Sequence, residues 1–199
     1  MSQRRNPVLS RAALSILGAL LIVSAAFAQP VGGERFTASL VDPAGNFGRG
    51  SNTAPVLIHI DHYSSDAEVQ RLAGILSRKG PSALRDALWD REDGFIRVGG
   101  GLGYPIAAAR SRPGENGGRV IRIMIDRPIS QREVIENTRT VDYPFTFIEI
   151  KLDRNGKGEG QFYAAAKVRM SGDTLDVESF SPQPLRLLAV TSRDTTARR

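Results

Sequence analysis

Residues 145–152, Phe-Thr-Phe-Ile-Glu-Ile-Lys-Leu, decide the fold of this chain, because they alternate between two sets of side chains with a period of two. That period is typical of a β-strand whose two faces differ. Residues 161–170 have the same period, and we expect all their even-numbered side chains on one face. Asn155-Gly156 lies between the two runs and tolerates the positive φ of a tight turn, so an antiparallel hairpin is predicted.

The sheet is predicted to continue beyond this hairpin. Ser171-Gly172-Asp173 is a second turn sequence, and residues 175–180 alternate again. Residues 185–191 supply a last apolar strand. One face of this four-stranded antiparallel meander is apolar, so it needs a cover from the earlier part of the chain.

A helical hairpin is the predicted cover. Ser65-x-x-Glu68 is a capping box, and the apolar residues after it recur with helical spacing. Gly80 suits the position after a helix, and Pro81 prevents the helix from continuing. A second, shorter helix is predicted over residues 82–93.

Further strands are predicted on both sides of these helices. A hairpin is expected around the glycine-rich residues 99–103, between a strand at 95–98 and a strand at 106–110. The remaining predicted strands are residues 35–41, 56–60 and 119–126.

Together these elements predict an α+β fold. It is mainly an antiparallel β-sheet, sandwich or barrel-like, with an inserted helical hairpin and one short extra helix. The extra helix is expected from Ser130 to about Asn137, because Ser130-x-x-Glu133 is a second capping box.

Residues 1–28 have the features of an export signal. Arginines precede an apolar run from Ala12 to Ala25, and Ala26-Phe27-Ala28 fits the small-x-small cleavage pattern. The run is too short for a stable membrane span. The predicted organisation is a signal peptide (1–28), a single domain (29–193) and a disordered polar tail (194–199), in a protein exported to the periplasm or out of the cell.

Charge and cysteine content exclude several classes of function. Loss of residues 1–28 removes three arginines and no acid, so the net charge falls from +6 to +3. No basic stripe remains to suit a nucleic acid partner. The chain has no cysteine, which excludes disulfides and thiol nucleophiles.

The chain resembles a family of secreted bacterial proteins for which no function is known. Three stretches carry the resemblance, which runs from the first capping box nearly to the C-terminus: Asp126-Arg127-Pro128-Ile129, Asp142-Tyr143-Pro144-Phe145 and Gly156-Lys157-Gly158-Glu159-Gly160. The resemblance implies a single exported domain and says nothing about chemistry.

His59-x-Asp61-His62 is the sequence that most resembles a metal site. On a strand, His59 and Asp61 share one face, whereas His62 points to the other. A tetrahedral site needs three or four converging ligands, so we predict that these residues do not bind a metal, and no cofactor is expected.

Phe145, Phe147 and Glu149 are the candidate ligand-binding residues, because they share the mixed face of the first meander strand. Glu149 also has a structural interpretation as the cross-strand partner of Lys167.

No catalytic motif stands out, since the chain has no Gly-x-Ser-x-Gly nucleophile elbow. The preferred hypothesis is an exported, non-catalytic domain that binds a small apolar molecule or an envelope protein. One alternative is a hydrolase with an unrecognised site, using His59 and Asp61. The other is a structural or assembly module that binds protein through a sheet edge.

Protein isolated from the cell envelope is expected to begin at or near Gln29, because cleavage after Ala28 fits the pattern. N-terminal sequencing checks this. A cytoplasmic protein that retains residues 1–28 would contradict the predicted signal.

Overall fold

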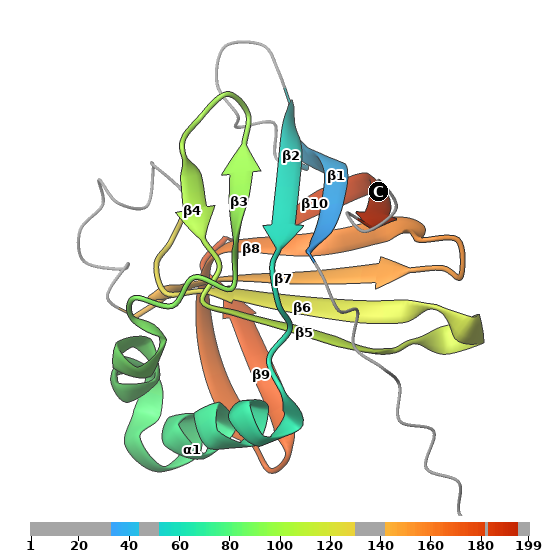
Figure 1. Ribbon diagram of the computed structural model, residues 1–199. Coiled ribbons are helices and arrows are strands. Elements are labelled where there is room, and N and C mark those ends of the chain that lie inside the picture. Colours follow the sequence, from blue (N-terminus) through green and yellow to red (C-terminus); the bar gives the residue numbers. More distant parts are fainter. Residues whose placement is uncertain (1–32, 44–51, 130–141, 182, 195–199) are drawn as a thin grey trace, which may run out of the picture.

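The computed structural model describes residues 33–43, 52–129, 142–181 and 183–194 (Figure 1). Within them the elements follow in the order β1 (Glu34–Val41), β2 (Thr53–Ile60), α1 (Asp66–Leu88), β3 (Gly94–Val98), β4 (Gly103–Pro105), β5 (Ala108–Pro113), the 3-10 turn η1 (Glu115–Gly117), β6 (Arg119–Ile125), β7 (Phe145–Leu152), β8 (Lys157–Ser171), β9 (Thr174–Ser179) and β10 (Leu185–Asp194).

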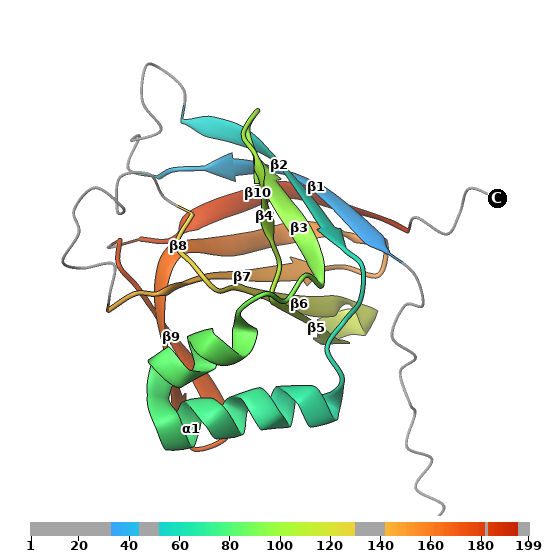
Figure 2. The same cartoon turned by 60° about the vertical axis from the view of Figure 1, so that its left-hand side comes forward.

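The strands form one antiparallel sheet in the order β4-β3-β2-β1-β10-β8-β7-β6-β5. This sheet curls into a half-barrel, and α1 lies beneath one end of it (Figures 1 and 2). β9 pairs only with the second half of β8 and projects from the sheet toward α1. The predicted antiparallel, β-rich architecture is confirmed.

The inner face of the sheet holds the main core. Phe36, Ile58, Ile123, Ile150 and Phe162 come from five different strands, and each is less than 2% exposed. Burying each of these side chains contributes roughly 1.5–3 kcal/mol. Aliphatic and aromatic side chains thus fill the inside of the half-barrel.

A bulge in β8 creates a second core on the outer face. Phe147 pairs with Tyr163 but Phe145 pairs with Ala166, so β8 has one residue more than β7 between these two pairs. The extra residue reverses the side-chain alternation. Phe162 therefore faces the inner core, whereas Val168 packs against α1, and the prediction of a single face for the even-numbered residues of 161–170 is wrong.

The glycine-rich hairpin differs from the predicted one. β3 pairs with Gly103–Pro105, whereas the next strand, Ala108–Pro113, leaves β3 and pairs with β6. Two backbone hydrogen bonds mark the change of partner: Asp93 N donates to Ile106 O at 2.7 Å, and Ala107 N donates to Met124 O at 3.0 Å. The residues between β4 and β5 thus connect the first and the last strand of the sheet order.

One kinked helix replaces the predicted helical hairpin. The chain between residues 66 and 88 is helical throughout except at Gly80, where φ is +83° and the axis bends (Figure 2). Ser65 caps the helix, and its hydroxyl accepts a hydrogen bond from Glu68 N at 3.2 Å. The predicted break at Gly80 and Pro81 is therefore a bend and not a separation into two elements.

Two other predictions concern residues at or beyond the limits of the described ranges. The short helix predicted over 130–137 lies outside the described residues. The predicted tail at 194–199 begins one residue too early, because Asp194 is the last residue of β10, and 195–199 lie outside the described residues. The turn at Asn155-Gly156 is confirmed, with a φ of +71° at Gly156.

Gly158→Ala is expected to destabilise the protein by about 2 kcal/mol or more, because a Cβ there would lie 1.8 Å from the carbonyl oxygen of Lys151. Gly100→Ala is the control, since a Cβ at Gly100 meets no atom within 4 Å. Urea midpoints measure both. Equal urea midpoints for Gly158→Ala and Gly100→Ala would contradict the close approach of β7 and β8 at Gly158.

Candidate functional site

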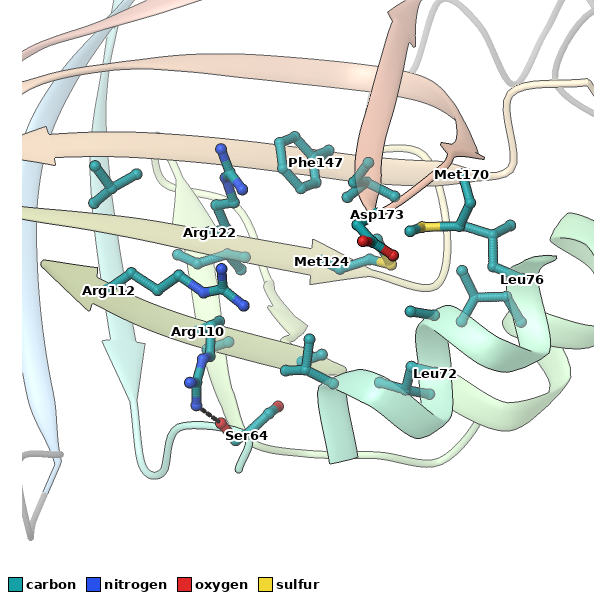
Figure 3. Close-up of a pocket in the computed structure, with 18 of the residues that line it drawn as sticks. Ser64, Leu72, Leu76, Arg110, Arg112, Arg122, Met124, Phe147, Met170 and Asp173 are labelled. Atoms are coloured by element: carbon teal, nitrogen blue, oxygen red, sulfur yellow. Dashed lines mark hydrogen bonds between the residues drawn. The ribbon is translucent and has the colours of Figure 1, made fainter. Parts of the chain in front are cut away.

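A pocket of about 420 Å³ lies on the outer face of β5, β6 and β7 (Figure 3). α1 and the turn between β8 and β9 cover it. Small-molecule sites commonly have volumes of roughly 300–1,000 Å³, so this pocket is large enough for one.

One end of the pocket is apolar. Leu72 and Leu76 of α1 face Met124 and Phe147 of the sheet, and Met170 at the end of β8 closes this side (Figure 3). Leucine and methionine side chains contribute no hydrogen-bonding group except a weak thioether acceptor. This end favours an apolar group, and Asp173 from the β8–β9 turn is the charged side chain that Figure 3 labels there.

Arginines line the other end. Side chains on the outer face form rows, because antiparallel register places residues of neighbouring strands opposite each other. One row contains Met124 opposite Ala108, and in the next row Arg110 of β5 lies directly opposite Arg122 of β6. Arg112 is one row farther along the same face, and Figure 3 shows the three arginines away from Leu72 and Leu76.

Two of these arginines have acidic partners. Arg110 forms an ion pair with Asp66 in the first turn of α1, and its Nη1 donates to the Ser64 carbonyl oxygen at 2.8 Å. Arg122 Nε donates to Glu149 at 2.8 Å. The positive charges of Arg110 and Arg122 are therefore balanced locally.

Arg112 differs from them. It is exposed and has no acidic partner among the described residues. Two polar atoms in the pocket wall, Ser64 Oγ and Arg110 Nε, are buried with no hydrogen-bond partner in the part of the chain that the structure describes. Within the described residues the arginine end thus has unpaired hydrogen-bonding capacity, as do His59 Nδ1 and Asp126 Oδ1 outside the pocket.

The predicted ligand-binding residues have different positions. Phe147 lines the pocket. Phe145 is fully buried beside it in the second core. Glu149 holds Arg122 and does not pair with Lys167, which lies opposite Glu178. The β7–β8 register places Gln161 opposite Glu149, so the predicted partnership of Glu149 and Lys167 is wrong.

The three arginines were not among the predicted site residues. The available signal was their alternation: Arg110 and Arg112 flank the small, buried Ser111, and Arg122 lies between the buried Ile121 and Ile123. This alternation places each arginine on an outer face. The alternation does not show that β5 and β6 are neighbouring strands.

The histidines lie away from this pocket. His59 Nε2 is 3.0 Å from Asp61 on the outer face of β2, and the His59 ring lies 5.4 Å from that of Phe95. His62 is exposed and lies 3.9 Å from Asp93. Among the described residues, no three His, Asp or Glu side chains gather in a possible metal-binding group. The proposal that these residues bind no metal stays a prediction.

A buried carboxylate network lies at one end of the half-barrel. Glu34 is 1% exposed, and its two oxygens accept hydrogen bonds from Arg119 at 2.5 and 3.1 Å. Tyr63 donates at 2.6 Å and Ser192 at 2.5 Å. The network joins β1, β6 and β10, and neither carboxylate oxygen lacks a donor. It therefore serves as a structural tie between distant strands.

The pKa of Glu34 reflects this environment. Burial by itself raises the pKa of the carboxyl, but the hydrogen bonds from Arg119, Ser192 and Tyr63 and the charge of Arg119 outweigh burial, so the pKa is lowered. A lowered pKa in the folded state stabilises the fold at pH values above the ordinary value of 4.5. That stabilisation is lost as pH falls through the folded-state pKa.

No family model, curated protein or solved structure matches this chain. The resemblance to a family of secreted bacterial proteins therefore stays a proposal. No helix in the described residues has the length and hydrophobicity that crossing a membrane requires.

Glu34→Gln is expected to lower the free energy of unfolding at pH 7 by about 3 kcal/mol, because it leaves the Arg119 charge without its buried partner. The variant should also lose less stability than the wild type between pH 5 and pH 3, since the carboxylate that titrates is gone. Urea denaturation across this range measures both effects.

Glu159→Gln is the matched control for Glu34→Gln. Glu159 is 65% exposed and pairs with Arg186 at 3.2 Å, so its loss should change stability by less than about 1 kcal/mol. A Glu34 variant no less stable than this control would contradict the structural role of the network.

Proposed function

We propose that this protein is an exported, non-catalytic domain that binds a small, largely apolar molecule in the pocket between the β5–β7 face and α1. The supporting observation is the pocket itself. It combines a volume of about 420 Å³ with an apolar wall contributed by the helix, the sheet and the β8–β9 turn. Export rests on residues 1–28 of the sequence.

The wall of the pocket suits an apolar guest. Leu72 and Leu76 are less than 9% exposed, and both help to form the second core as well as the wall. A ligand would remove from water the apolar surface that remains exposed between α1 and the sheet. Each CH₂ group buried there contributes about 0.8 kcal/mol to binding.

A second pocket, of about 380 Å³, is less suited to this function. It lies along Glu149, Lys151, Glu159, Gln161 and Arg186, so charged and amide groups form most of its wall. Burying such groups against an apolar guest costs free energy because their hydrogen bonds to water would be lost.

The other two hypotheses have less support. A hydrolase using His59 and Asp61 would need these side chains in a concave polar site, and neither residue lines the two pockets. Pairing at a sheet edge would favour an uncharged edge strand. Asp176 and Glu178 lie on β9, and β4 is only three residues long and ends in Pro105.

The uncharged fluorescent probe N-phenyl-1-naphthylamine is expected to bind with increased fluorescence, because its naphthyl group fits the apolar end of the pocket. Ala73→Trp should weaken binding at least about tenfold, since Ala73 lines the pocket and a larger side chain fills it.

Ala67→Trp on the exposed first turn of α1 is the control and should bind the probe like the wild type. Thermal denaturation should show that both tryptophan variants are folded. A wild-type protein that does not bind the probe, or equal affinities for the two variants, would contradict the proposed site.

A further inference from the structure

We propose that the ligand of this pocket is an aliphatic monocarboxylate, whose chain lies at the leucine and methionine end and whose carboxylate binds Arg112. This inference rests on the proposed function, because it names the class of molecule that the same pocket binds.

The opposed arginines are the first argument. Like charges directly opposite each other on neighbouring strands are destabilising, and Arg110 and Arg122 are such a pair. Their neutralisation requires Asp66 from α1 and Glu149 from β7. Solubility alone does not explain why a third arginine, Arg112, lies one row away from this pair.

The charge balance at this end specifies a single negative charge. Asp66 pairs with Arg110, and Glu149 pairs with Arg122 at 2.8 Å and with Lys151, which does not line this pocket, at 3.8 Å. Arg112 remains without an acidic partner among the described residues. Its planar guanidinium presents parallel N–H groups that match the two oxygens of a carboxylate.

The buried polar atoms at this end are the second, independent argument. Ser64 is 2% exposed, and its Oγ lacks a hydrogen-bond partner in the described part of the chain. Ser64 lines the pocket, and a hydroxyl can donate a hydrogen bond to an anion. Arg110 Nε in the same wall also lacks an acceptor there. Both atoms can donate, and an anion accepts.

The position of Asp173 sets the direction of the ligand. This carboxylate comes from the turn between β8 and β9, and Figure 3 shows it near Met124 and Met170, away from the three arginines. A carboxylate ligand is attracted to the arginine end and repelled from Asp173. The chain of the ligand therefore lies along Leu72 and Leu76.

The volume sets the size of the ligand. At about 30 Å³ for a water-sized group, a pocket of about 420 Å³ holds on the order of ten to fifteen non-hydrogen atoms. Decanoate falls within this range. Its uncharged analogue 1-decanol and its cationic analogue decylamine have chains of the same length, so they separate charge recognition from apolar binding.

The test measures binding of decanoate, 1-decanol and decylamine to the full chain by calorimetry and by displacement of N-phenyl-1-naphthylamine. Decanoate should bind more tightly than the other two. Arg112→Gln should weaken decanoate binding about tenfold and leave 1-decanol unchanged, because it removes a hydrogen-bonded charge and not the apolar wall. Arg154→Gln, on the exposed β7–β8 turn, is the matched control and should change neither.

Two results would overturn the inference while leaving the proposed function in place. One is equal binding of decanoate and 1-decanol with no effect of Arg112→Gln. The other is a preference for decylamine that Asp173→Asn removes. If none of the three molecules nor the probe binds in either assay, both the inference and the proposed function fail.

Discussion

The bulge in β8 is the constraint on which the rest of the structure depends. A strand with unbroken alternation gives one set of side chains to each face along its whole length. By placing two residues of β8 opposite Thr146, the bulge lets even-numbered residues serve the inner core before it and the outer core after it. Without this reversal, Val168 and Met170 would point away from α1, and the helix would lose the part of its packing surface that β8 contributes.

The bulge is held by groups around it. The Thr146 hydroxyl is fully buried and lies 2.9 Å from the carbonyl oxygens of both Arg127 and Ala164. Ile129 N also donates to the Ala164 oxygen, at 3.1 Å. A carbonyl that leaves the regular β7–β8 ladder is thus satisfied by the segment after β6. The lost ladder bond is replaced, and this explains why the irregularity is tolerated in the middle of the sheet.

Much of the fold could be predicted from the sequence, because alternation and turn residues are local signals. The strands β7 to β10 and the turn at Gly156 are of this kind. The predicted meander order is wrong, because β10 pairs with β8 and not with β9, and the signal at Gly80 and Pro81 marks a bend and not the predicted helix end. The bulge was not predictable, since Ala164 and Ala165 pack equally well on either face. The arginine end was not predicted either, because the strand at 106–110 was assigned to a hairpin with 95–98, whereas β5 pairs with β6.

The Glu34 network and the arginine end of the pocket differ in how their hydrogen bonds are completed. This difference gives the Glu34 network a structural role and leaves the arginine end for a ligand. Glu34 is almost completely buried, yet each of its oxygens accepts two hydrogen bonds, so the cluster needs nothing from outside the protein. The arginine end has acids for only two of its three charges and leaves Ser64 Oγ unpaired in the described residues. Arg110 also positions α1 over the pocket, because it donates to the Ser64 carbonyl oxygen and pairs with Asp66 in the first turn of the helix. An anion that binds beside Arg110 would therefore act on the contact that holds α1 over the pocket.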